Sequence, residues 1–169
     1  VPVPGDGSYE WGGYLEIKKK PNILNPPEGF FATANSNLTS REFPYKNAIG
    51  WEWSDPSRWA RVNELLGANN KITMQDMAMI QTDYLSNPAR TIVPLLKYLK
   101  SNDSKAEKAR QMLLDWDYYM DPSSVEAGIY EAWQREITKS IKEIYVPSKA
   151  SKLFRSLPLK RVIDWLLSP

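Results

Sequence analysis

The sequence contains no cysteine and no histidine among its 169 residues. These absences exclude disulfide bonds, thiol nucleophiles, zinc sites of the Cys/His kind, and any Ser–His or Cys–His catalytic pair formed within this chain. No apolar run approaches the roughly 20 residues of a membrane-spanning helix. The lack of cysteine assigns no redox compartment, because proteins of oxidising compartments can also lack disulfides.

Net charge is also small. The 22 Lys and Arg residues nearly balance the 20 Asp and Glu residues, which gives a formal net charge of +2. Nucleic acids and anionic membrane surfaces attract strongly basic proteins, so we expect neither a nucleic-acid partner nor a membrane partner. The chain is long enough for one domain of ordinary size or for two small ones.

Two zones differ in composition. Residues 1–53 contain more than half of the Gly and Pro residues, and two β-prone runs, 13–17 and 30–34, lie between turn-forming stretches. This pattern predicts two or three short strands with long connections. So few strands give a thin core, so this zone is not expected to be stable alone.

Residues 54–169 carry helical signals. Thr73 and Asp76 have the spacing of a capping box, and Pro94 predicts a break inside a helical pattern. We expect helices from Ser54–Pro56 to Gly67, from Thr73, over 88–99, from Ser104, over 125–144 and over 160–167. No fixed period links them. The expected fold class is mainly α with a small β portion, and the helical part is irregular.

Two charged clusters invite a functional hypothesis. Lys18–Lys20 is the one tight basic run, and a solvated turn explains it better than a binding site. Asp115, Asp117 and Asp121 suggest a metal site. Aromatic residues interrupt their spacing, however, and the Gly and terminal Glu of a calcium loop are missing. An acidic turn at a helix end is the better interpretation.

Two apolar groups are also ambiguous. The methionines at positions 74, 77 and 79 are typical of adaptable core filler. Five aromatic residues near the zone boundary could line a pocket, but aromatic residues at this density more often form interior packing. They are Phe43, Tyr45, Trp51, Trp53 and Trp59.

Asn35 follows an apolar run directly, at a point where the chain must turn. One interpretation is a polar strand end, because asparagine tolerates turn conformations. The other is an oxyanion donor, because a side-chain amide just past a rigid strand can be held in a fixed position. The pattern alone leaves both open.

An ordered set of residues resembles the penicillin acylase (penicillin amidase) family of N-terminal nucleophile hydrolases. The resemblance is strong over residues 1–66, moderate to about 133 and weak afterwards. The matching residues are Val1-Pro2-Val3-Pro4-Gly5, Gly7, Trp11, Gly13, Asn25-Pro26, Gly29, Ala34-Asn35, Phe43-Pro44, Trp53, Arg58 and Leu65-Leu66. Later matches are Gln81-Thr82-Asp83 and Leu113-Leu114-Asp115-Trp116-Asp117.

This resemblance implies a mechanism without histidine. In the family, precursor cleavage exposes an N-terminal Ser whose hydroxyl attacks an amide carbonyl while its own α-amine acts as the base. By position, Asn35 corresponds to the asparagine that holds the oxyanion. Arg58 corresponds to the arginine that orients the catalytic amides and amine, although a helix-face ion pair would equally explain an arginine there.

The resemblance also sets expectations for architecture and ligands. Residues 1–53 are expected to complete part of the catalytic αββα layer, and residues 54–169 to form a helical domain. The nucleophilic Ser is expected about two hundred residues before Val1, so this chain alone should be inactive. We expect no cofactor in this chain. Some family members bind a structural calcium ion, and by position one of their carboxylate ligands corresponds to Asn47 here, an uncharged oxygen ligand. The resemblance therefore implies that calcium, if bound, is a ligand of the parent protein, and Asn47 is a weak candidate for its site.

The expected partners are the rest of the same precursor, meaning the small chain and the nucleophile-bearing part of the large chain. The expected substrate is a small N-acyl amide, and family substrates include β-lactams, acylated homoserine lactones and aromatic amides. The resemblance suggests a periplasmic or extracellular location. Two other hypotheses remain: a non-catalytic homologue or helical interaction module, and an aromatic-rich carbohydrate- or peptide-binding domain.

Overall fold

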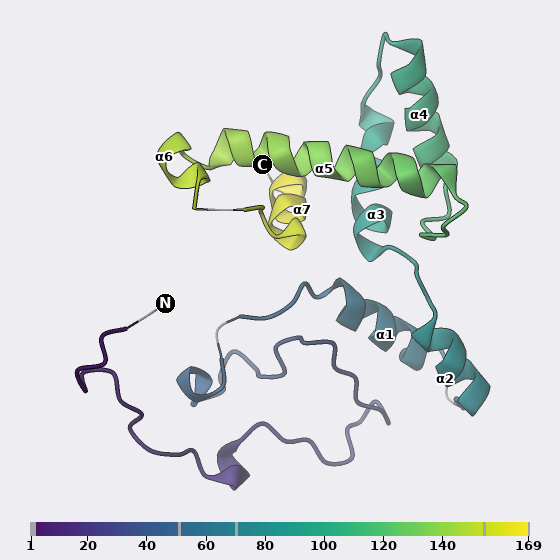
Figure 1. Ribbon diagram of the computed structural model, residues 1–169. Coiled ribbons are helices and arrows are strands. Elements are labelled where there is room, and N and C mark those ends of the chain that lie inside the picture. Colours follow the sequence, from purple (N-terminus) through teal and green to yellow (C-terminus); the bar gives the residue numbers. More distant parts are fainter. Residues whose placement is uncertain (1–2, 51, 70, 154, 169) are drawn as a thin grey trace. The chain divides into compact units, whose positions relative to one another are not determined.

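The computed structural model describes residues 3–50, 52–69, 71–153 and 155–168. The chain divides into two compact units, Val1–Ser54 and Asp55–Pro169, and each is described by itself. Figure 1 draws the first unit from purple to blue and the second onward to yellow. No helix in the described ranges is long and apolar enough to cross a membrane.

The first unit is mostly irregular chain. It contains two short 3-10 turns, η1 (Ile17–Lys19) and η2 (Lys46–Ala48). Of its described residues, only Ala32 and Ser36 are buried. Large apolar side chains such as Trp11 and Tyr14 are almost fully exposed. The described part of this unit therefore has almost no hydrophobic interior.

The described residues contain no β-strand, so the strands predicted over 13–17 and 30–34 are wrong for this structure. β-prone residues form a strand only when a neighbouring segment supplies the ladder hydrogen bonds, and no described segment does so here. The mainly α fold class is confirmed. Its β portion is one isolated antiparallel bridge, between Leu85 and Tyr119 in the second unit.

The second unit is an irregular array of helices, as the sequence predicted. They are α1 (Ser57–Gly67), α2 (Met74–Gln81), α3 (Asn87–Ile92), η3 (Val93–Tyr98), α4 (Ser104–Asp115), α5 (Val125–Tyr145), α6 (Ser148–Ser151) and α7 (Leu159–Leu167). Each predicted helix is present within a few residues of its expected bounds. The short α6 was missed because four residues are too few to show a periodic pattern.

Two local predictions are confirmed in detail. The Thr73 hydroxyl accepts the Asp76 backbone N–H, and the Asp76 carboxylate accepts the Thr73 backbone N–H, which completes a capping box. The helix broken by Pro94 ends as α3 at Ile92 and continues as the 3-10 helix η3. Proline causes this change because it has no N–H to donate and its ring obstructs the preceding turn.

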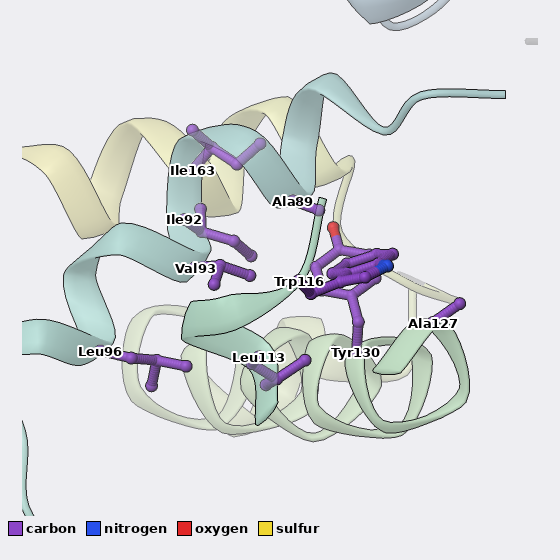
Figure 2. Close-up of a cluster of buried hydrophobic side chains, with 9 residues drawn as sticks. All are labelled: Ala89, Ile92, Val93, Leu96, Leu113, Trp116, Ala127, Tyr130 and Ile163. Carbon is purple, nitrogen blue, oxygen red and sulfur yellow. The ribbon is translucent and has the colours of Figure 1, made fainter. Parts of the chain in front are cut away.

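The hydrophobic core of the second unit lies where α3, η3, α4, α5 and α7 meet. Figure 2 shows its buried side chains, which are Ala89, Ile92, Val93, Leu96, Leu113, Trp116, Ala127, Tyr130 and Ile163. Ile92 and Val93 are completely buried. Burial of each such side chain stabilises the fold by about 1.5–3 kcal/mol. This core holds α3 rigidly, and α1 packs against α3.

The interpretation of the methionine cluster as core filler is wrong. Met74, Met77 and Met79 are exposed, and α2 has no buried residue. Trp53 and Trp59 are also exposed, at 41% and 39%. Phe43 and Tyr45 pack edge to face, with their ring centroids 5.9 Å apart. The remaining aromatic residue of that cluster, Trp51, lies outside the described residues. Periodicity places the three methionines and Trp59 on helix faces but does not show whether another element covers those faces.

Candidate functional site

Asn35 lies at a sharp turn of the first unit. Its φ angle is +57°, in the left-handed region that asparagine tolerates better than most residues do. Its backbone carbonyl accepts a hydrogen bond from the Ser54 backbone N–H at 3.0 Å. The Asn35 side chain is exposed. The turn thus fixes the backbone that carries the Asn35 amide, as an oxyanion donor requires.

The residues around Asn35 alternate between buried and exposed positions. Ala32 and Ser36 are buried, whereas Phe31, Thr33 and Asn35 are exposed. The Ser36 hydroxyl oxygen is buried and forms no hydrogen bond with any described residue. A buried hydroxyl without a partner is unfavourable. Ser36 is internal in the chain and carries no free α-amine, so it does not have the features of an N-terminal nucleophile.

Arg58 lies in the first turn of α1. The Asp55 carboxylate accepts the Ser57 backbone N–H at 2.9 Å, and the Asn87 side-chain amide donates to the Ser57 carbonyl at 3.1 Å. Asn87 is the first residue of α3, so α3 holds the residue directly before Arg58. The helix dipole disfavours a cation at this end of a helix. Intrinsic helix stability therefore does not explain an arginine here.

A largely buried ion pair holds the next turn of α1. Arg61 donates to both carboxylate oxygens of Asp83, with both distances at 2.8 Å. The two side chains are 13% and 11% exposed. The Arg61 guanidinium holds the pKa of the Asp83 carboxyl below its usual range, mainly through these hydrogen bonds. Asp83 follows α2, so this pair fastens α1 to the α2–α3 connection.

Glu64 extends the contacts along the same helix. Its two carboxylate oxygens accept hydrogen bonds from the Arg90 guanidinium of α3 at 2.9 and 2.7 Å. Arg61 also donates to Glu64, at 3.0 Å. Hydrogen bonding with Arg90 lowers the pKa of Glu64. Because these contacts follow those at Ser57, α1 is fixed along much of its length.

Asn47 lies in the middle of η2 and is exposed. No group of three or more acidic side chains that could hold a metal ion exists among the residues described. Calcium prefers six to eight oxygen ligands, several of them usually carboxylates. Asn47 supplies one uncharged oxygen ligand, so calcium at this position stays a prediction, and no catalytic step is assigned to it.

The acidic residues near the end of α4 line a cavity of about 640 Å³, together with aromatic side chains. Asp117 accepts the Tyr119 backbone N–H, and Asp121 accepts the Ser123 backbone N–H, so both carboxylates close local turns. Helix α4 ends at Asp115. The structure thus confirms an acidic turn at a helix end. The residues that line the cavity are Tyr84, Met112, Asp115, Trp116, Asp117, Tyr119, Asp121, Ser124 and Glu126.

Comparison with known proteins identifies the family. The sequence model of the penicillin amidase family matches residues 1–168, nearly the whole chain. This chain belongs to the penicillin amidase family. The match extends through the C-terminal helices, where the resemblance read from individual residues was weak.

Individual relatives agree with this assignment. Penicillin acylase 2 proenzyme of Pseudomonas sp. (strain SE83) is 32% identical over 143 residues, which cover 83% of this chain and 18% of the relative. Acyl-homoserine lactone acylase QuiP of Pseudomonas fluorescens (strain Pf0-1) is 26% identical over 157 residues, which cover 83% of this chain and 19% of the relative. Penicillin G acylase of Escherichia coli is 26% identical over 122 residues, which cover 69% of this chain and 14% of the relative. The chain therefore spans less than one fifth of the length of these relatives.

The predicted site residues lie in different units. Asn35 and Asn47 belong to the first unit and Arg58 to the second. Sequence reasoning did not find the Arg61–Asp83 pair. Asp83 appeared only as one of the family matches, and nothing in the sequence linked it to Arg61, 22 positions earlier.

Proposed function

We propose that this chain is part of the large chain of an amidohydrolase that cleaves a linear N-acyl amide. Membership of the penicillin amidase family and the named acylases among its relatives support this reaction class. In this proposal, an N-terminal Ser in another part of the precursor attacks the amide carbonyl. Its α-amine takes the hydroxyl proton and returns a proton to the leaving amine.

Asn35 and Arg58 have separate roles in this reaction. The Asn35 side-chain amide donates a hydrogen bond to the oxyanion of the tetrahedral intermediate, where negative charge develops. The Arg58 guanidinium orients the catalytic amides and the α-amine, for which a planar cation with several fixed donors is suited. The observation that carries the proposal is the turn at Asn35, which combines a left-handed backbone with an exposed amide.

The remaining parts of the proposal concern partners and location. The chain covers 18% of a relative named as a proenzyme, which supports the rest of the same precursor as its partner. We assign the nucleophile to that remainder and expect this chain alone to be inactive. We place the parent in the periplasm or outside the cell, where its relatives' substrates would be met. We assign any calcium ion to the parent as a whole, in which Asn47 would supply one uncharged oxygen ligand.

The test uses the intact parent enzyme and a chromogenic N-acyl amide. Asn35→Ala should lower kcat by about a hundredfold or more, the usual effect of removing an oxyanion donor. Asn35→Gly tolerates the left-handed backbone and also removes the amide, so it should lose as much activity. The matched control is Asn37→Ala, because the Asn37 side chain accepts hydrogen bonds from Thr39 in a local turn.

Two results would contradict the proposal. One is that Asn35→Gly retains full activity, which would assign Asn35 to the turn alone. The other is that the intact parent hydrolyses no N-acyl amide, which would favour a non-catalytic homologue. Thermal unfolding of each variant separates loss of activity from loss of fold.

A further inference from the structure

Positive charge is concentrated in one stretch of the chain, residues 135–161. Eight Lys and Arg residues and two acidic residues fall here, a formal charge of +6 in a chain whose net charge is +2. The stretch covers the C-terminal half of α5, all of α6 and the start of α7. Folding places four of these cations around one cavity, and like charges held close together are unfavourable unless negative charge balances them.

Part of this stretch lines a cavity of about 370 Å³ that is open to solvent. One wall is the C-terminal half of α5, and the other is Arg155–Leu157, the segment shortly before α7. The cavity is lined by Gln134, Arg135, Thr138, Lys139, Lys142, Arg155, Ser156 and Leu157. No carboxylate is among these residues. The helical spacing of 135, 139 and 142 places three cations on one face of α5.

Among the described residues, ion pairs balance some of these cations, such as Arg135 and Lys160, but not all of them. Lys139 and Arg155 form no ion pair with any residue that the structure describes. Arg135 contacts Glu131 at 3.3 Å, and the Arg135 side chain remains 75% exposed. The acidic residues Glu136 and Glu143 lie three and four positions from Lys139 on α5, but both are exposed, and neither lines the cavity or forms an ion pair among the described residues.

We propose that this cavity binds a small multivalent oxyanion of the phosphate class. The two guanidinium groups offer planar pairs of donors that match phosphate oxygens, and the two ammonium groups add charge without fixing the geometry. The volume lies near the lower end of the range for small-molecule sites. Lys139 and Arg155, which form no ion pair among the described residues, together balance a dianion better than a monoanion. Because the cavity is open to solvent, binding should weaken strongly with salt.

The experiment titrates inorganic phosphate into the isotopically labelled 169-residue chain at low ionic strength and follows the amide resonances by NMR. Acetate at matched ionic strength serves as the monovalent comparison. The cavity variant is Lys139→Gln/Arg155→Gln. The control variant is Lys149→Gln/Lys152→Gln, which removes the same charge from exposed residues that do not line the cavity.

We expect saturable shifts confined to 134–142 and 155–157, with acetate binding far more weakly. The cavity variant should bind phosphate about tenfold more weakly or worse, the loss of about 1.4 kcal/mol expected when two charged contacts are removed. The control should change affinity less than twofold. If the cavity variant fails to fold, Arg155→Lys replaces it, since it keeps the charge and loses the paired donors.

Several results would overturn the proposal. Shifts spread over all basic residues would indicate a diffuse ion atmosphere. An equal loss of phosphate affinity in the cavity variant and in the control variant would also indicate a diffuse ion atmosphere. Equal affinity for acetate and phosphate would exclude a multivalent site. None of these readouts depends on amide hydrolysis, so the outcome is independent of the proposed function.

Discussion

The Arg61–Asp83 pair allows a quantitative prediction about stability. Asp83→Ala removes two charge-assisted hydrogen bonds of 2.8 Å and leaves a guanidinium that is only 13% exposed. Removing one partner of a fully buried pair costs about 3–5 kcal/mol. Here Glu64 still contacts Arg61, and some solvent reaches both groups, so we expect a loss of about 2 kcal/mol.

Urea unfolding followed by tryptophan fluorescence measures this loss. For a slope of about 1–3 kcal/mol per molar urea, the midpoint should fall by about 1 M. The matched control is Glu131→Ala, which breaks the exposed pair with Arg135 and should cost less than about 1 kcal/mol. A double-mutant cycle with Arg61→Ala isolates the interaction between the two side chains. If the losses of unfolding free energy in the two single variants simply add up in the double variant, the two side chains do not stabilise each other and the prediction is refuted.

The same pair predicts how stability depends on pH. Because folding lowers the pKa of Asp83, the unfolded chain takes up the proton first as the pH falls. The stabilisation is therefore present above the unfolded pKa of about 4 and is lost as the pH falls through the folded pKa. The difference in unfolding free energy between the original chain and Asp83→Ala should be constant from about pH 5 to 7 and should narrow below about pH 4. A difference that widens on acidification would contradict this assignment.

Three further outcomes follow from the second unit. Ile92→Ala should lower the unfolding free energy by about 2–4 kcal/mol in a urea titration, because the side chain is fully buried. Leu99→Ala, at a position that is 57% exposed, should cost much less, and equal losses would contradict the core assignment. Thr73→Ala should cost about 1 kcal/mol through the lost cap, and no measurable change would count against the capping box. Burial raises the pKa of Tyr130 to about 12, so its contribution to stability is present below the unfolded pKa of about 10 and is lost as the pH rises toward 12. An NMR titration in which Tyr130 ionises at about pH 10, the ordinary value for a tyrosine, would disagree with this burial.

The helices were predictable where short-range interactions decide them. The capping box at Thr73 and Asp76 depends on residues three positions apart, and the break at Pro94 depends on one ring. Both are visible in the sequence for that reason. Strands differ, because a β-prone run such as 30–34 needs a partner segment, and no local pattern shows whether that partner is near.

The candidate site divides in the same way. The turn at Asn35 was predictable because an apolar run ends in a residue that tolerates left-handed backbone. The Arg61–Asp83 ion pair was not predictable. It joins residues 22 positions apart, and whether they meet depends on how α1 and α3 pack. Likewise, the exposure of the methionines in α2 depends on whether another element covers that helix, which periodicity does not reveal.

The bridge between Leu85 and Tyr119 makes the 33 residues between them a closed loop that holds α3, η3 and α4. Closing a flexible loop of that length costs about 3 kcal/mol of chain entropy before constant terms, but doubling its length adds only about 0.6 kcal/mol. Insertions between η3 and α4, around 99–103, should therefore be tolerated thermodynamically. Natural length variation within this part of the family is expected to concentrate there, while the two bridging segments keep their spacing from the core helices.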